Sequence, residues 1–307
     1  MQQPLPFEKF TLKVRPVVAD EIEKRIDIWK NGATNLSPSD WHQALELNTI
    51  PDQDKVLKKN ENEEKKDQNL VIDCRNWYES GVGRFEGAER LLINRHQESF
   101  KALETLFGKV EPKKTNVLMY CTGGIRCVKL GAFVKQEFGF KSVNQLQGGI
   151  INYVNYIRTG GDTEKLKPEN LYKILQEEKS EGVINQVKSK FIGKNYVFDE
   201  RRGQRVTQDV LSKCDSCGGE SDYHINCRNP TCHVLFIQCE KCQTHRKGTC
   251  SDECLRIYEM PEEEKKRFRK EFGGTLKIKN PSAFQPKIHS TLNLPQNFIN
   301  SVDQMKI

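Results

Sequence analysis

The sequence predicts an α/β fold in which helices flank a parallel sheet, followed by a small cysteine-rich zinc-binding segment. Between residues 36 and 158, short apolar runs alternate with helical patterns, which is typical of βαβ units around a parallel sheet. One cysteine stands at the junction between such a strand and the next helix, and eight more lie within 41 residues near the C-terminal end. These observations also point to the chemistry.

Composition leaves room for one or two domains with a real core. The chain has 307 residues, of which 36% are hydrophobic and 30% are charged, so part of its length is expected to be solvated loop or tail. The net charge is +7. Two zinc ions on eight thiolates would add four positive and eight negative charges and reduce it to about +3. Charge alone is therefore a weak argument for a nucleic-acid partner.

The first residues and the cysteines together predict the cellular compartment. No apolar run is long enough to span a membrane, and the first residues have neither a charged nor an apolar leader region. We therefore expect a cytoplasmic protein with no membrane partner. In that reducing compartment the eleven cysteines are expected to be metal ligands or reactive thiols and not disulfides.

The first part of the chain is expected to hold little structure of its own. Residues 1–35, with a possible strand at 10–14 and a weak helical pattern at 21–30, are too few to bury a core. Ser37, Pro38 and Asp40 form a good helix start for a helix that reaches Leu47. Residues 52–69 have mixed charge and almost no aliphatic side chains, which predicts a solvated loop insertion.

Three strand ends are expected to meet at one edge of the sheet. The strands at 70–75, 117–120 and 143–146 end at Arg75, Cys121 and Gln147, and the active loops of parallel sheets lie beyond such carboxyl ends. Helices are expected at 98–107, after Cys121, and at 150–157. Asp73 and Arg75 are either a surface ion pair or groups that orient the loop after Cys121.

Cys121 is the strongest candidate for an active residue. The backbone N–H groups of the loop after it, and the start of the next helix, would stabilise its thiolate. Glycines let these amides converge, and Arg126 can add a fork of donors. A small apolar core residue is the alternative. The candidate catalytic residues are Cys121, Arg126, Asp73 and Arg75, and those of the active-site loop are Thr122, Gly123, Gly124, Ile125 and Cys127. Cys127 is either a helix-packing residue or a resolving or auxiliary thiol.

The second strong signal is the group of late cysteines. They form four close pairs: Cys214 and Cys217, Cys227 and Cys232, Cys239 and Cys242, Cys250 and Cys254. Eight thiolates suit two tetrahedral zinc ions, and metal binding would supply the folding energy of a segment with little apolar material. Free buried thiols are the alternative. Spacing does not reveal which pairs share an ion, and His224, His233 and His245 are close enough to replace a cysteine.

Two further stretches complete the domain plan. Residues 161–213 are expected to be a helical, charged connector, and residues 255–307 a helix followed by a mobile tail. Within the connector, the aromatic-flanked basic cluster at 196–202 is either an RNA contact or a strand edge packed against a neighbour. The cysteine-rich zinc-binding segment then covers 214–254.

The chain resembles the rhodanese superfamily, whose active loop runs from Cys to Arg over six residues, as Cys121 to Arg126 does. More narrowly it resembles the rhodanese-like tRNA uridine hydroxylases, over roughly residues 8–258, and it is similar to eukaryotic sulfurtransferase-domain proteins too. The matching motifs are Leu36-Ser-Pro-Ser-Asp-Trp41, Ile72-Asp73-x-Arg75-Asn76-x-Tyr78-Glu79, Phe85-x-Gly87-Ala88, Tyr120-Cys-Thr-Gly-Gly-Ile-Arg-Cys127, Gly148-Gly149-Ile150, Val197-Phe198-Asp199-x-Arg201 and Cys232-His233-x-Leu235-Phe236-Ile237-Gln238-Cys239.

The resemblance implies a rhodanese-like domain at 36–160 and tRNA as partner. It also implies oxygen-dependent 5-hydroxylation of wobble uridine 34, with molecular oxygen as co-substrate. Residues 1–35 would be the remnant of a small α/β domain with which the family usually opens. Two alternatives stay open: a sulfurtransferase that passes sulfur through a Cys121 persulfide, and a non-catalytic, zinc-stapled module that binds RNA or protein. The oligomeric state is not predicted.

Overall fold

The computed structural model describes residues 25–47, 68–108, 110–162, 187–199 and 201–271. The strand expected at 10–14, most of the insertion expected at 52–69, the first half of the connector and the tail after residue 271 lie outside the described residues. Of the helix expected at 21–30, residues 25–30 form a loop and a turn. The Asp27 carboxylate accepts the N–H groups of Trp29 and Lys30, a local arrangement that competes with a helix.

The chain divides into two compact units, residues 1–212 and 213–307, and each is described by itself. The first is built on a five-stranded sheet in the order β1-β6-β5-β2-β4, in which all neighbouring strands are parallel. The strands span Thr34–Leu36 (β1), Gln68–Asp73 (β2), Glu89–Arg90 (β4), Thr115–Tyr120 (β5) and Val143–Leu146 (β6). The α/β class with a parallel sheet is confirmed. The edge strand β1 was not expected.

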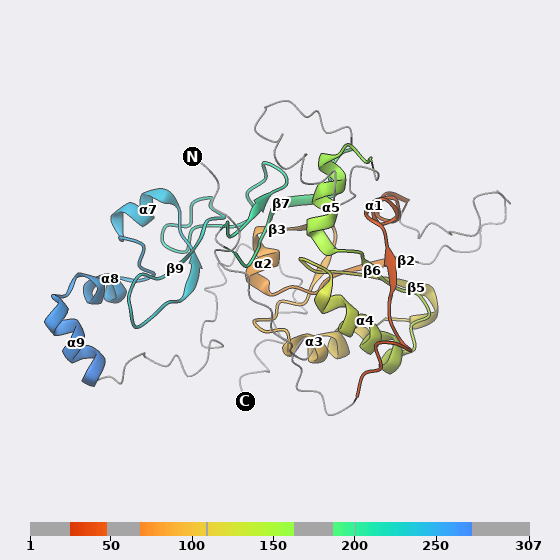
Figure 1. Ribbon diagram of the computed structural model, residues 1–307, viewed down its shortest axis with the longest axis horizontal. Coiled ribbons are helices and arrows are strands. Elements are labelled where there is room, and N and C mark those ends of the chain that lie inside the picture. The colour runs from red at the N-terminus through yellow and green to blue at the C-terminus, as the bar shows by residue number, and fades with distance from the viewer. Residues whose placement is uncertain (1–24, 48–67, 109, 163–186, 200, 272–307) are drawn as a thin grey trace. The chain divides into compact units, whose positions relative to one another are not determined.

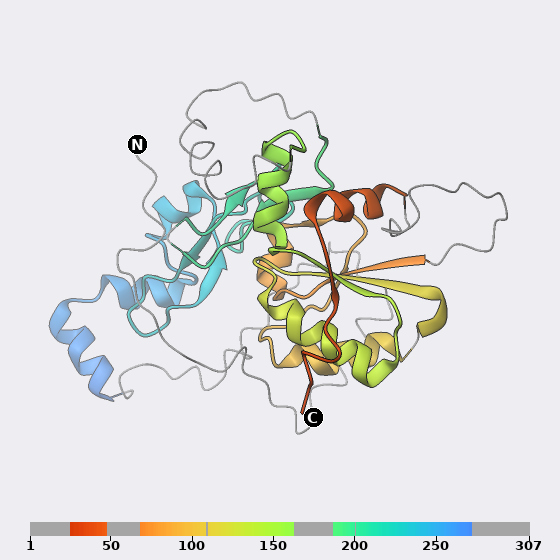
Figure 2. The same cartoon turned by 45° about the vertical axis from the view of Figure 1, so that its right-hand side comes forward.

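Helices cover both faces of this sheet (Figures 1 and 2). One face carries α3 (Glu98–Phe107) and α4 (Ile125–Phe138), and the other carries α1 (Pro38–Leu47) and α5 (Gly149–Arg158). The central strand β5 serves both cores, because Val117 and Met119 face one and Leu118 and Tyr120 face the other. A strand buried on both faces reads as an unbroken apolar run, as the stretch before Cys121 does.

A second, antiparallel sheet joins β3 (Gly83–Phe85), β7 (Phe191–Asn195) and β8 (Gln204–Arg205). The short helix α2 (Trp77–Val82) leads into β3, and a 3-10 turn at Pro112–Lys114 leads into β5. The described second half of the expected connector is therefore part of the fold. Phe191 is fully buried and contacts Phe85, so burial of one aromatic side chain outweighs the charged residues around it.

The second unit contains a hairpin of β9 (His224–Asn226) and β10 (Leu235–Ile237), followed by α7 (Glu240–His245), α8 (Asp252–Glu259) and α9 (Glu262–Glu271). Its buried apolar cluster is small: Cys227, Phe236 and Cys254. So few apolar residues leave most of the stabilisation to other interactions. None of the described helices combines the length and apolar character needed to cross a membrane.

Candidate active site and cysteine groups

Cys121 directly follows β5 and is almost fully buried, with 1% of its surface exposed. The loop after it leads into α4, whose first residue is Ile125. Gly124 has a φ of +87°, a conformation that favours glycine. Its backbone N–H donates to Cys121 Sγ at 3.1 Å. The loop thus turns its amides towards the sulfur, as expected from the sequence.

The loop rests on the first turn of α5, at the end of β6. The N–H groups of Ile150 and Ile151 donate to the carbonyl oxygens of Cys121 and Thr122 at 3.0 and 3.1 Å. A Cβ on Gly149 would lie 2.5 Å from the Cys121 carbonyl oxygen, so only glycine allows this approach. The expected meeting of strand ends at one edge therefore holds for Cys121 and the glycine pair after Gln147.

Cys121 is held as a thiolate at neutral pH. Its pKa is lowered to about 6, and the largest cause is a hydrogen bond from the Cys127 thiol. Burial opposes this effect, while the Arg126 charge and the backbone N–H groups of Cys127 and Arg126 add to it. Burial raises the pKa of Cys127, as do its hydrogen bonds to Cys121 and Cys74. Cys127 therefore stays protonated and serves as donor. It also packs in the core, so both interpretations of this residue have a structural basis.

The carboxylate that holds the loop is Glu79, a fully buried residue of α2. Arg126 donates to both of its oxygens at 2.7 Å, and Thr122 Oγ1 donates to Oε1 at 3.0 Å. Glu79 also accepts the backbone N–H of Asn76 at 3.2 Å. Such a buried, bidentate ion pair restricts the geometry of both side chains. Glu79 was not among the candidate site residues, although the motif at residues 72–79 contains it and it lies in the first turn of a helix beyond a strand end.

Asp73 and Arg75 form a second buried ion pair near the loop. Both are fully buried, so the surface ion pair considered above is wrong. Arg75 donates to Asp73 through Nε at 2.9 Å and Nη2 at 2.7 Å, and it also donates to the Gly83 carbonyl oxygen. Tyr120, the residue before Cys121, donates to Asp73 at 2.7 Å. Through these hydrogen bonds the pair links the ends of β2 and β5 to β3. It is connected to the loop through Tyr120, which precedes Cys121.

The rim of the loop is exposed and apolar in part. Ile125 is 61% exposed, Ile151 is 39% exposed and Phe198 is 61% exposed. The Arg126 guanidinium carbon lies 6.0 Å from the centre of the Phe198 ring. The buried Cys121 sulfur is therefore surrounded by a loop that presents apolar side chains at the surface.

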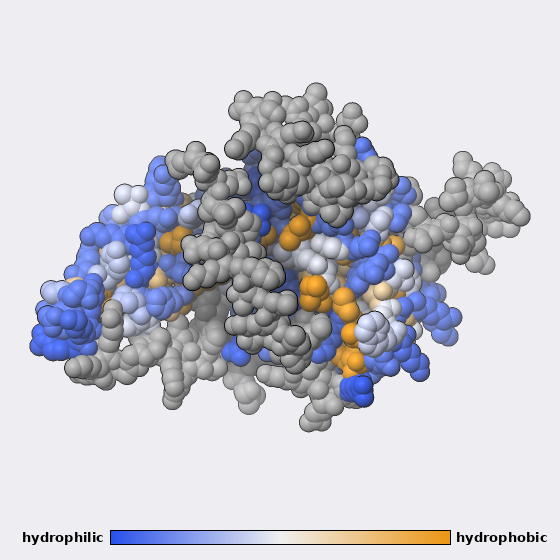
Figure 3. All heavy atoms as spheres, in the orientation of Figure 1, coloured by the Kyte–Doolittle hydropathy of each residue, from blue (hydrophilic) through white to orange (hydrophobic). Residues whose placement is uncertain are grey.

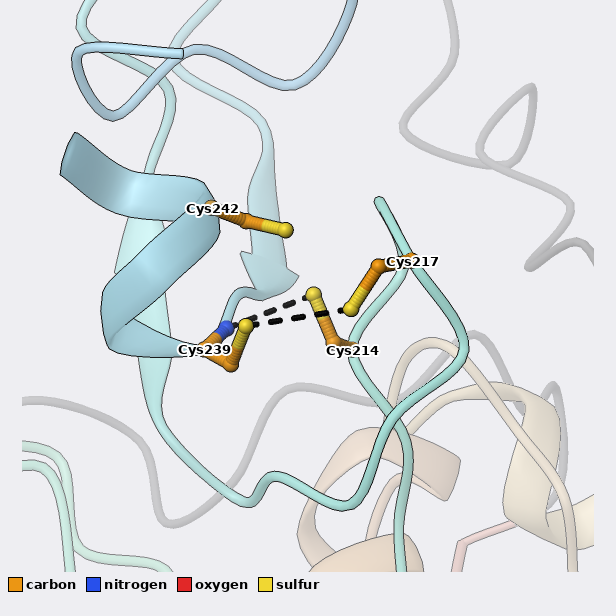
Figure 4. Close-up of side chains that lie close together, drawn as sticks. All are labelled: Cys214, Cys217, Cys239 and Cys242. Carbon is orange, nitrogen blue, oxygen red and sulfur yellow. Dashed lines mark hydrogen bonds between the residues drawn. The ribbon is translucent and has the colours of Figure 1, made fainter. Parts of the chain in front are cut away.

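In the second unit, the cysteines form two groups of four. In the first, Cys214 and Cys217 face Cys239 and Cys242, and the four side chains point towards a common centre (Figure 4). Cys217 Sγ and Cys239 Sγ are 3.8 Å apart, and the Cys239 N–H donates to Cys214 Sγ at 3.3 Å. Each group has all its sulfurs within 4.8 Å of one another, so each could hold a metal ion.

The second group contains Cys227, Cys232, Cys250 and Cys254. Its sulfur separations are 3.7 Å for Cys232 to Cys250 and 3.6 Å for Cys250 to Cys254. The first pair along the chain thus joins the third, and the second joins the fourth, an interleaved arrangement that the spacing did not reveal. The three candidate histidines, His224, His233 and His245, belong to neither group.

Comparison with known proteins agrees with this architecture. Residues 52–156 match the model of the rhodanese-like domain, and residues 192–255 match that of the rhodanase C-terminal segment. The chain therefore contains a rhodanese-like domain. The resemblance found in the sequence is confirmed. The C-terminal match begins in β7 and ends just after the last cysteine.

The chain is similar to several proteins named tRNA uridine(34) hydroxylase. It is 39% identical to that of Leptospira interrogans over 72% of this chain and 53% of the relative. It is 38% identical to that of Pectobacterium carotovorum, over 74% of this chain and 55% of the relative. It is 37% identical to that of Cronobacter sakazakii, over 74% of this chain and 56% of the relative. The chain thus spans about half the length of these curated relatives. A solved Saccharomyces cerevisiae homologue of single-domain rhodanese is 12% identical with a TM-score of 0.33, over 44% of this chain and 88% of that one, a similarity too low to carry an argument.

Proposed function

We propose that this chain takes part in tRNA modification, as a hydroxylase of wobble uridine that uses Cys121 as its essential thiol. The observation that carries the proposal is a buried thiolate at a Cys-to-Arg loop in a chain similar to proteins of that name. In this proposal tRNA is the partner, molecular oxygen is the co-substrate and the cytoplasm is the compartment.

The residues around Cys121 have separate tasks in this proposal. The Cys127 thiol and the loop amides keep the sulfur ionised, and a thiolate is the nucleophilic form of cysteine. Glu79 holds Arg126 and Thr122 in place, so the loop is rigid before substrate arrives. Asp73 and Arg75 support it from behind through Tyr120. The exposed apolar rim suits a flat nucleobase better than a small anion.

We infer that the two cysteine groups hold one structural zinc ion each. Four thiolates at about 2.3 Å from a tetrahedral zinc lie about 3.8 Å apart, and the separations of 3.6 to 3.8 Å within the two groups fit this value. Backbone N–H donors to Cys214 and Cys227 suit ionised sulfur. The ions would add the stabilisation that the small apolar core of this unit lacks.

Nucleoside analysis tests the proposed activity directly. Total tRNA from cells lacking the protein should lose 5-hydroxyuridine and its derivatives at the wobble position. Wild-type protein should restore them, and the Cys121→Ser variant should not. Cys74→Ser is the control for loss of another buried thiol, because Cys74 is equally buried and reaches Cys121 only through Cys127. Unchanged modification in the deletion strain would refute the proposal.

Sulfur transfer is the second candidate, and the rhodanese-like domain match favours it. A Cys121 persulfide would be stabilised by the same amides. Thr122 is the one hydroxyl between Cys121 and Arg126, and the Arg126 charge is already paired with Glu79. We therefore expect weak thiosulfate:cyanide activity. Robust turnover of thiosulfate, together with unchanged 5-hydroxyuridine in the deletion strain, would make this chain a sulfurtransferase.

A further inference from the structure

Exposed apolar side chains gather around the Cys121–Arg126 loop. Six large apolar side chains of the described residues are exposed: Trp29, Ile125, Ile151, Phe198, Val210 and Tyr223. Three of them adjoin one loop. Ile125 belongs to it, Ile151 donates its N–H to Thr122, and Phe198 lies against Arg126.

Scattered single apolar side chains are normal on protein surfaces. Most of the described surface in Figure 3 is hydrophilic, and apolar residues interrupt it only in small groups. A group of three around a loop that holds a buried thiolate differs from scatter, because grouped apolar exposure marks binding sites.

Phe198 is the exposed end of a row of aromatic rings. Its ring meets that of Tyr196 edge to face with centres 5.2 Å apart, and Tyr196 meets Tyr78 in the same way at 5.4 Å. The Tyr78 hydroxyl accepts a hydrogen bond from Asn76 Nδ2 at 2.8 Å. Tyr196 is buried, so the row fixes Phe198 from behind while 61% of its surface stays open.

Positive charge lies beside this row. The Arg126 guanidinium lies near the Phe198 ring. Arg202 is near enough to Tyr196, the middle ring of the row, to lower the pKa of Tyr196, although burial raises that pKa more strongly. An exposed aromatic face with cations nearby is how proteins hold an unstacked base and the phosphates next to it. A small anion would need the cations but not the ring.

We propose that Phe198, together with Ile125 of the neighbouring loop, is the stacking platform for the wobble base. The base would lie on the Phe198 ring with its edge towards Cys121, and Arg202 would contact the adjoining phosphate. This inference rests on the proposed function for the identity of the base. In this proposal Phe198 positions the substrate and takes no part in the reaction of the Cys121 sulfur.

The test uses the full chain and an anticodon stem-loop RNA with 2-aminopurine at the wobble position. Stacking on Phe198 should quench the 2-aminopurine fluorescence. Phe198→Ala should abolish the quenching and weaken binding about 5- to 150-fold, the range for loss of one stacked base. Phe198→Trp should restore both. Trp29→Ala is the matched control, because Trp29 is 93% exposed in a segment that contacts the far end of α4 through Gln136.

A second RNA without a base at the wobble position completes a double-mutant cycle. Wild-type protein should bind this RNA about as weakly as Phe198→Ala binds the intact one, and the variant should lose nothing further. If Phe198→Ala lost the same factor of affinity for both RNAs, the platform would be wrong. The same holds if Phe198→Ala binds the intact RNA within twofold of wild type, or if Phe198→Trp does not restore binding and quenching. Failure of the wild-type chain to bind the stem-loop would also overturn the proposal. Cys121 alkylation should be the same in all variants, which verifies an intact loop.

Platform and activity can fail separately. If the wild-type chain makes 5-hydroxyuridine and Phe198→Ala changes neither binding nor quenching, the platform is wrong and the activity stands. If quenching depends on Phe198 but no 5-hydroxyuridine forms, the platform stands and the proposed hydroxylase function is wrong.

Discussion

Replacing Cys127 by alanine tests the origin of the Cys121 thiolate. The variant removes the thiol that donates to Cys121 and leaves the loop amides and Arg126 in place. A hydrogen bond to a charged group contributes about 1.5 to 3 kcal/mol, and one pKa unit corresponds to about 1.4 kcal/mol. The pKa of Cys121 should therefore rise from about 6 by about 1 to 2 units.

The assay is the pH dependence of iodoacetamide alkylation at Cys121, followed by mass spectrometry of its peptide because the chain has eleven cysteines. At pH about 7 the variant should react about 2- to 10-fold more slowly, since only the thiolate reacts. Cys127→Ser keeps a donor and should stay closer to wild type. Cys74→Ala, which removes the other partner of Cys127, should not raise the midpoint. A midpoint that stays at its wild-type value in Cys127→Ala would refute this account.

Two further predictions concern Glu79 and the cysteine groups. Glu79→Gln leaves the largely buried Arg126 charge without its partner, so the free energy of unfolding should fall by about 3 kcal/mol or more in urea titrations. Because the Arg126 charge is then uncompensated, the Cys121 alkylation midpoint should also move down, and an upward shift would contradict the assigned pairing. The control is Glu253→Gln, since Glu253 forms an exposed ion pair, and this change should leave the unfolding transition nearly unaltered. Purified protein should carry about two zinc ions per chain by elemental analysis, and Cys217→Ser should lose at least one. Metal-free protein with a normally folded second unit would leave the cysteines as packing residues.

Elements with strong local patterns were predictable from the sequence. The helix at Glu98–Phe107 and the strand at Val143–Leu146 lie where they were expected, because apolar spacing reports burial directly. Strand β1 has three residues, of which only Leu36 is buried, so it has no periodicity to read. Strand β7 was hidden by charged neighbours, although its side chains alternate between buried and half-exposed.

The candidate site was predictable where the chain is continuous and not where distant segments meet. Cys121, its glycines and the following helix are neighbours in sequence, and their arrangement follows from a strand-to-helix turn. Whether Asp73 or Glu79 reaches Arg126 depends on how α2 packs, since both are carboxylates near the same strand end. Arg75 lies two residues from Asp73 and donates to both of its carboxylate oxygens. Glu79 is therefore the carboxylate that accepts hydrogen bonds from the loop after Cys121. Pairing of the late cysteines is likewise a long-range property.

The interleaved cysteine pairs have a consequence for synthesis. On a growing chain, the first four of these thiols to emerge are those of Cys214, Cys217, Cys227 and Cys232, which the folded unit divides between two groups. A metal ion captured by this early set would have to be released before either native group could close. If the two groups hold metal, a metal ion bound to this early set would therefore be a kinetic trap for the nascent segment. Cells that delay metal delivery until Cys254 has left the ribosome would avoid it.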